Sequence, residues 1–168
     1  MNPAARRRRI RAFTLVELMI AVTIIGIVAA LVRPAVTRVI QLVRGNALMN
    51  DCRVFAAGFV QYAHTNGAYP ASYTTAGGFP ATMAGLINQT QWKRAAPIGG
   101  NYAFLKDNTI GGVKYRALIR VSGSGATAIK FTSAQLLRLD QKSDNGNLAT
   151  GQLFTNGAAL NTYYVVEQ

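Results

Sequence analysis

The stretch Phe13-Thr-Leu-Val-Glu-Leu-Met-Ile-Ala-Val-Thr-Ile-Ile-Gly-Ile-Val-Ala-Ala-Leu-Val32 decides the fold. Sixteen of its twenty residues are apolar, and Glu17 is its only charged residue. As a helix, at about 1.5 Å per residue, it would be about 30 Å long, which matches the hydrocarbon core of a bilayer. A secretory signal peptide has a shorter apolar stretch and an Ala-x-Ala-like cleavage site, and no such site follows here. The stretch therefore predicts a helix that spans a membrane.

Basic residues precede this stretch more densely than they follow it. Five arginines and no acid occur in residues 1–12, whereas Arg33, Arg38 and Arg44 are spread thinly after it. The positive-inside bias therefore predicts a cytoplasmic N-terminus, with the rest of the chain on the other side of the membrane. The formal net charge of the 168 residues is +12. Without residues 1–12, thirteen basic and six acidic residues remain, a net charge of +7.

Glu17 is the most informative residue of the span. A carboxylate inside a membrane costs on the order of 3 kcal/mol or more, so it requires a partner. A free α-amino group would serve, and cleavage before Phe13 would create one. The segment Arg11-Ala-Phe-Thr-Leu-Val-Glu-Leu-Met-Ile20 resembles the class III signal of type IV pilins and type II secretion pseudopilins. That signal is a short basic leader and a small residue, followed by Phe-Thr-Leu-x-Glu at the start of an apolar helix.

The resemblance implies how the chain matures. A prepilin peptidase would remove the leader, residues 1–12, by cutting between Ala12 and Phe13, and would then N-methylate Phe13. In the family the residue before the cut is nearly always Gly, and here it is Ala12. By the same resemblance, Glu17 would neutralise the new amino terminus of a neighbouring subunit and so set the register of a helical filament.

The resemblance also implies partners and a location. The partners would be other pilin or pseudopilin subunits, an inner-membrane platform protein, an assembly ATPase and membrane lipid. The chain would cross the bacterial inner membrane once, with its head in the periplasm, and the filament would form in the periplasm or at the cell surface. The remaining positive charge would be a solvated surface and not a nucleic-acid site.

The helical pattern continues beyond the span. Apolar residues recur at spacings of mostly three and four up to Tyr62, and Gly67 followed by Pro70 is a stop signal. Proline inside a helix removes a hydrogen bond and clashes with the preceding turn, and pilins often carry one here, so we expect a bend at Pro34. We predict one helix from Phe13 to about Asn66: residues 13–34 as membrane span or filament core, and residues 35–66 as an amphipathic half.

Residues 67–168 are predicted to form a globular head. Frequent Gly and Pro indicate a loop region at residues 67–101, with one helical turn at residues 81–88, and Trp92 is expected to pack in the core. Residues 102–168 are predicted to form a small antiparallel sheet, with a short helix that opens at a Thr132–Gln135 capping box and ends near Asp140. The strands are predicted at residues 102–106, 113–121, 127–131, 152–155 and 162–166. The fold class is α+β and pilin-like: a long bent N-terminal helix packed against this sheet.

The head offers few groups for chemistry. A single cysteine, Cys52, excludes an internal disulfide, and a single histidine, His64, leaves no His/Cys zinc cluster or Ser-His-Asp arrangement. We expect no catalytic residue, no cofactor and no metal. The resemblance leaves calcium as the alternative, because major pseudopilins bind it in a loop of the head. The calcium candidates here are Asp140, Asp144, Asn145 and Asn147, although Lys142 intervenes and the spacing departs from the EF-hand pattern.

These features favour a structural subunit over an enzyme. The absence of a cysteine pair, which many major type IV pilins use near the C-terminus, and the pseudopilin-like segment Asn66-Gly-Ala-Tyr-Pro70 favour a pseudopilin. The alternative is a minor type IV pilin with a surface or DNA-binding role through Arg116 and Arg120. The predicted strand carries no aromatic residue on that basic face to stack bases, which favours a solvated sheet face. A membrane-anchored periplasmic enzyme is the third hypothesis.

Overall fold

The computed structural model describes residues 13–123, 125–157 and 160–168, except for the side chains of residues 34 and 35. The chain forms two compact units, which divide between Val39 and Ile40. Helix α1 (Leu15–Asn66, 52 residues) contributes to both units. The leader cleavage residue Ala12 lies outside the described residues.

In the first unit, α1 is exposed on every side. Each residue of the predicted span from Phe13 to Val32 is exposed, and its large apolar side chains point outward all round the helix. A helix that is apolar on every face suits a membrane or the centre of a helix bundle. The helix continues through Pro34 without a break, and the bend at this residue stays a prediction.

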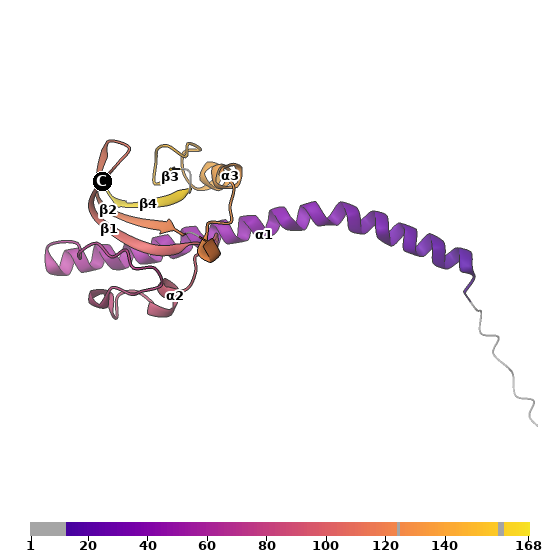
Figure 1. Cartoon of the computed structure of the whole chain (residues 1–168), viewed down its shortest axis with the longest axis horizontal. Coiled ribbons are helices and arrows are strands. Elements are labelled where there is room, and N and C mark those ends of the chain that lie inside the picture. Colours follow the sequence, from indigo (N-terminus) through magenta and orange to yellow (C-terminus); the bar gives the residue numbers. More distant parts are fainter. Residues whose placement is uncertain (1–12, 124, 158–159) are drawn as a thin grey trace, which may run out of the picture. The chain divides into compact units, whose positions relative to one another are not determined.

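In the second unit, the C-terminal part of α1 packs against a four-stranded antiparallel sheet (Figure 1). The strand order is β1 (Asn101–Ile110), β2 (Val113–Ser122), β4 (Asn161–Glu167) and β3 (Leu153–Asn156). The predicted class, a long N-terminal helix and a small antiparallel sheet, is confirmed. The remaining elements are two single 3₁₀ turns, η1 (Ala81–Met83) and η2 (Gly125–Thr127), and two helices, α2 (Gln89–Lys93) and α3 (Ser133–Ser143).

The face of α1 that packs on the head begins at Gly45. Leu48, Cys52, Phe55 and Phe59 are almost completely buried, and the Phe59 ring stacks on Phe104 of β1 with 3.9 Å between ring centroids. The earlier residues of the predicted apolar stripe, Val36, Ile40 and Val43, are exposed. The amphipathic half therefore packs on the head over its C-terminal part only.

The first hairpin differs from the prediction. A link from Asp107 to Gly112 was expected, but β1 continues to Ile110, and only Gly111 and Gly112 form the turn. Both glycines have positive φ, which a two-residue hairpin turn of type I′ requires. Thr109 and Ile110 are β-branched, which favours strand conformation, and both pair with β2. The residues expected in the link therefore extend β1 up to the two-residue turn.

The outer face of the sheet also carries a buried cluster, which strict alternation does not predict. Leu118 of β2 is fully buried on this face, and the ring of Phe154 stacks between Tyr115 and Tyr163 at centroid distances of 5.3 and 5.1 Å. Two local irregularities interrupt the alternation of side chains between the two faces of the sheet. The β2–β4 pairing shifts register between Ala117 and Leu118, and Asp107 of β1 has a φ of +47°.

Two further predictions concern the loops and α3. The strand predicted at residues 127–131 is wrong: one hydrogen bond, from the Lys130 N–H to the Ile98 carbonyl at 2.8 Å, replaces a strand ladder. The capping box at Thr132 and Gln135 is confirmed, and α3 runs three residues beyond Asp140. Helix α2 was not predicted, although Trp92 within it is buried as expected.

Candidate functional site

The first turn of α1 holds Glu17 in a reciprocal pair with Thr14. The Glu17 Oε2 atom accepts hydrogen bonds from the Thr14 backbone N–H and from Thr14 Oγ1, both at 3.0 Å. In return, the Glu17 backbone N–H donates to Thr14 Oγ1 at 3.2 Å. This is the geometry of a capping box, which satisfies two backbone donors that a helix start otherwise leaves free. The negative side chain also lies at the positive end of the helix dipole.

The box uses only part of the carboxylate. Both donors contact Oε2, and Oε1 accepts no hydrogen bond from the described residues. A carboxylate has roughly four acceptor positions, so Glu17 keeps capacity for a further donor. Phe13, which would carry the new amino group after cleavage, directly precedes the box and is exposed. Both box residues follow the predicted cut, so the box would survive removal of residues 1–12.

Sequence reasoning singled out Glu17 but missed its partner. The signal was present as Thr14-Leu-Val-Glu17, a Thr-x-x-Glu spacing directly before an apolar run. By length and composition, the surrounding helix is long and apolar enough to cross a membrane. None of its most apolar part is buried. The site is thus one acid, held locally, on an otherwise apolar surface.

The predicted calcium candidates lie in one loop, from the end of α3 to β3. Asp140 is completely buried, its carboxylate forms no ion pair with the described residues, and neither oxygen accepts a hydrogen bond of good geometry there. Burial raises the pKa of Asp140, and the nearby Asp144 carboxylate raises it further, against the lowering effect of the backbone N–H groups of Asn147 and Gly146. An unpaired, buried carboxylate is costly unless a cation accompanies it.

The other three candidates are engaged in holding the loop. Asp144 Oδ2 accepts the backbone N–H groups of Gln152 at 2.5 Å and Leu153 at 3.0 Å. Asn145 Oδ1 accepts from the Asn147 N–H at 2.8 Å, and Asn147 Oδ1 accepts from the Ala149 N–H at 3.0 Å. No group of three or more His, Cys, Asp or Glu residues gathers in the described part of the chain. The carboxylate ligands available for a cation such as calcium are therefore Asp140 and Asp144. Carbonyl or amide oxygens would have to supply the remaining ligands.

A buried acid in α1 fastens the loop region to the helix, and sequence reasoning missed it. Asp51 is 2% exposed and accepts hydrogen bonds from Gln91 Nε2 at 2.5 Å, Arg94 at 2.8 Å and the Tyr102 hydroxyl at 2.8 Å. Burial raises the pKa of Tyr102, and the neighbouring Cys52 and Asp51 raise it further, so its hydroxyl stays a donor. The local sequence carries no signal for this contact, because Asp51 falls off the apolar stripe and its partners lie 40 to 51 residues away.

The two arginines of the DNA-binding alternative are in different settings. Arg116 forms an ion pair with Glu167, and Arg120 pairs across the sheet with Tyr163 of β4. An aromatic residue of the neighbouring strand therefore lies beside Arg120. Tyr163 is only 7% exposed, so its ring is not available for stacking on bases.

The comparisons with known proteins agree on the N-terminal signal and the fold. The prokaryotic N-terminal methylation motif matches residues 7–32. Type II secretion system core protein G of Pseudomonas aeruginosa is 29% identical over 114 residues, which cover 63% of this chain and 80% of that protein. The structure of the major type IV pilin PilA1 from Clostridium difficile matches with a TM-score of 0.53 at 15% identity, over 78% of this chain and 99% of that one. The latter likeness shows a shared fold.

Proposed function

We propose that this chain is a member of the family of type IV pilins and type II secretion pseudopilins and acts as a structural subunit of a helical filament. The observation that carries the proposal is the methylation motif on a helix that is apolar all round and bears one acid near its start. The similarity to a core protein of a type II secretion system favours a pseudopilin over a type IV pilin.

The proposed mechanism of assembly exchanges lipid for protein around α1. The apolar side chains of residues 15–32 are exposed in the single subunit, so they need either acyl chains or neighbouring helices. Glu17 would enter the membrane with its charge partly satisfied by Thr14. On assembly, the free Oε1 would accept a hydrogen bond from the N-methylated amino group of Phe13 in a neighbouring subunit. This contact would fix the axial offset between the two helices.

Maturation is the step that exposes this amino group. We infer that prepilin peptidase cuts between Ala12 and Phe13 on the cytoplasmic side and methylates Phe13. N-terminal mass spectrometry of the protein from its host tests this directly, and the expected mature chain begins with N-methyl-Phe13. Ala12→Gly, which restores the usual family residue, should be cleaved at least as fully. An intact Met1, or a cut after Ala30, would overturn the assignment.

The remaining parts of the proposal concern location and partners. The arginine-rich N-terminus would stay in the cytoplasm while the second unit lies in the periplasm. An assembly ATPase and a platform protein would drive extrusion, and neither activity is assigned to this chain. A Glu17→Gln variant should still insert in the membrane, because it loses a buried charge, but should assemble poorly. Filaments in normal amounts from this variant would refute the role of Glu17.

A second proposed property is calcium binding at the loop after α3, favoured by the unpaired Asp140 carboxylate. Bound calcium would stabilise the folded head by linkage, by about 2.7 kcal/mol at a free concentration one hundred times its Kd. Asp140→Asn should abolish the difference in thermal unfolding between calcium and a chelator, whereas Asp107→Asn, an exposed acid in β1, should preserve it. Equal unfolding of the wild-type chain in calcium and chelator would exclude the site.

A further inference from the structure

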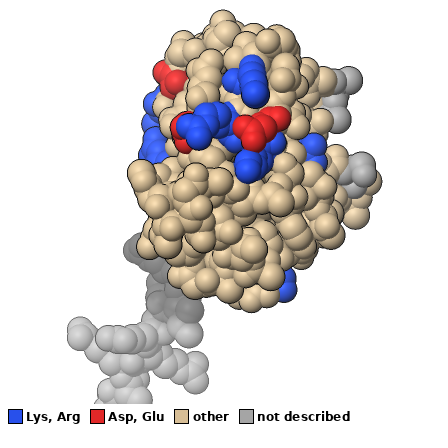
Figure 2. All heavy atoms as spheres, turned by 90° about the vertical axis from the view of Figure 1, so that its left-hand side faces the viewer, with Lys and Arg blue, Asp and Glu red and all other residues tan. Residues whose placement is uncertain are grey.

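The charged side chains of the second unit are distributed unequally between its two ends. One end carries Lys106, Lys114 and Arg116 together with Asp107 and Glu167. Figure 2 looks onto this end and shows acidic and basic side chains side by side. Arg116 and Glu167 form an ion pair here, beside a depression of about 420 Å³ that His64 and Tyr69 also line. This end, called the mixed end below, is close to electrically balanced.

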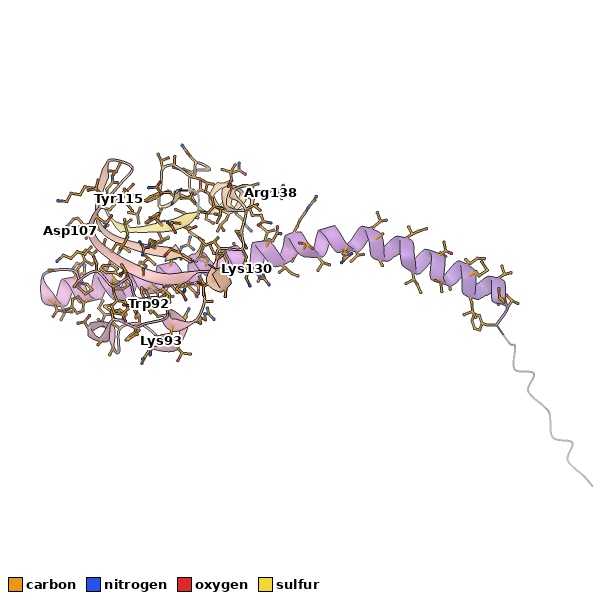
Figure 3. All side chains as sticks on the ribbon, viewed as in Figure 1. Trp92, Lys93, Asp107, Tyr115, Lys130 and Arg138 are labelled. Atoms are coloured by element: carbon orange, nitrogen blue, oxygen red, sulfur yellow. The ribbon has the colours of Figure 1, made fainter. Side chains whose placement is uncertain are left out.

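The opposite end of the second unit is basic. It is defined by Arg44 of α1, Lys130 of the loop before α3, and Arg138 of α3, all exposed. Figure 3 shows Lys130 and Arg138 at this end, well away from Asp107 at the mixed end. The place of α3 is fixed by Gly45, because a Cβ atom on this glycine would lie 2.8 Å from Leu139 Cδ1. Lys142 follows Arg138 by one turn on the exposed face of α3.

Acidic side chains do not form ion pairs with the cations of this basic end. Arg44, Lys130 and Arg138 form no ion pair with the described residues. The two acids of the nearby loop are otherwise engaged: Asp140 is buried, and Asp144 accepts the backbone N–H groups of Gln152 and Leu153. The basic end therefore presents cations that have no protein partner in the described part of the subunit.

The chain itself brings this end near a bilayer. α1 enters the second unit at Ile40, eight residues after Val32, the last apolar residue of the span. Eight helical residues measure about 12 Å, and electrostatic attraction reaches about 8–10 Å at physiological ionic strength. The short length of this segment keeps the basic end within a short covalent reach of the lipid phosphates. The mixed end has neither this proximity nor this charge.

We propose that the basic end (Arg44, Lys130 and Arg138) docks on the anionic lipid surface when the subunit is inserted but not yet assembled. The proposal rests on the proposed function in one respect, that the first unit spans a membrane. Each Lys or Arg near an anionic surface strengthens binding on the order of fivefold. Extraction into a filament would then require these contacts to be released, so the stored and assembled states differ at this end.

The test uses the full chain in nanodiscs of phosphatidylcholine, with or without phosphatidylglycerol. Trp92 is the only tryptophan and is buried in the second unit, so energy transfer from it to dansyl-labelled headgroups reports how close the head lies to the lipid. Transfer should rise with phosphatidylglycerol, fall as salt increases, and lose its lipid dependence in Lys130→Gln/Arg138→Gln. The matched control Lys106→Gln/Lys114→Gln removes the same charge from the mixed end and should behave as wild type.

The outcomes separate this proposal from the proposed function. Insertion with energy transfer that ignores phosphatidylglycerol would overturn lipid docking and leave the membrane-anchored subunit intact. Salt-sensitive cross-linking between copies through Lys130, without lipid dependence, would assign the basic end to a second copy of this chain and also overturn the proposal. Failure to insert in either kind of disc would overturn the membrane-anchored function itself, and lipid docking with it.

Discussion

Removal of the Arg94 guanidinium should destabilise the head although this side chain lies at the surface. The Arg94 side chain is 52% exposed, but it pairs at 2.8 Å with Asp51, whose side chain is 3% exposed. Arg94→Gln leaves that buried carboxylate with Gln91 and Tyr102 as donors and without a charge partner. Leaving a buried charge unpaired costs about 3–5 kcal/mol when both partners are buried.

The exposure of Arg94 reduces this cost, because the cation is already partly hydrated and its attraction is screened. A charge-assisted hydrogen bond contributes about 1.5–3 kcal/mol, so we expect a loss of about 2 kcal/mol. The matched control is Lys93→Gln, the preceding exposed residue, which forms no ion pair with the described residues and should change stability by less than about 0.5 kcal/mol.

Trp92 provides the readout for this comparison. Its ring contacts Phe55 and Phe59 of α1 at centroid distances of 5.0 and 5.6 Å, and it lies two residues from Arg94. Its emission in detergent-solubilised full chain should therefore follow the release of α2 from α1 during denaturant unfolding. In a double-mutant cycle, Asp51→Asn and Arg94→Gln should cost less together than the sum of the two single changes. An Arg94→Gln chain as stable as Lys93→Gln would refute the reasoning.

Three further predictions follow from close packing, burial and the capping box. Gly58→Ala would place a Cβ atom 2.3 Å from Ile87 Cγ2 and 3.0 Å from the Leu86 carbonyl. Denaturant unfolding should therefore show a free energy of unfolding lower by about 1–3 kcal/mol. The control is Gly26→Ala, whose Cβ atom would have nothing within 4 Å and should not reduce stability. Burial raises the pKa of the Cys52 thiol, so iodoacetamide should modify it at neutral pH only after unfolding, and rapid labelling of the folded chain would contradict its burial. Thr14→Ala should destabilise the start of α1 by about 0.5–2 kcal/mol, measured as faster amide exchange in the first turn. The control is Thr23→Ala, because the Thr23 hydroxyl donates to the Met19 carbonyl within the helix.

Local signals explain most of what could be predicted from the sequence. The end of α1 at Asn66, the start of α3 at Thr132 and the apolar span each depend on residues within a few positions of one another. Such patterns need no knowledge of the tertiary fold. The strand predicted at residues 127–131 was wrong because the segment packs against a glycine loop. A Cβ atom on Gly99 would lie 2.4 Å from the Ala128 carbonyl, and no strand of the described residues pairs with the segment.

The interactions that could not be predicted are those between distant residues. Nothing near Asp51 in the sequence indicates that Arg94 and Tyr102 will meet it, and α2 is too short for propensity to define it alone. The calcium candidates also show that sequence position alone does not define side-chain contacts. The sequence placed four oxygen-bearing residues in one loop, but only the fold shows that Asp140 is buried without an ion-pair partner in the described part of the chain, while Asn145 and Asn147 hold the backbone.

The capping box at Thr14 and Glu17 connects local structure to assembly. A helix start inside a membrane has backbone N–H groups that no water can satisfy, and the box satisfies two of them with side chains that the signal itself contains. In the proposed function, the same carboxylate would lower the cost of storing the subunit in lipid and would offer its second oxygen to a neighbour. If Glu17 were needed only as a partner for a neighbouring amine, position 14 could hold any residue. The Thr-x-x-Glu spacing instead shows that Glu17 also stabilises the start of α1 in the single subunit, so in the proposed function a Thr14 variant should affect the stored state as well as the filament.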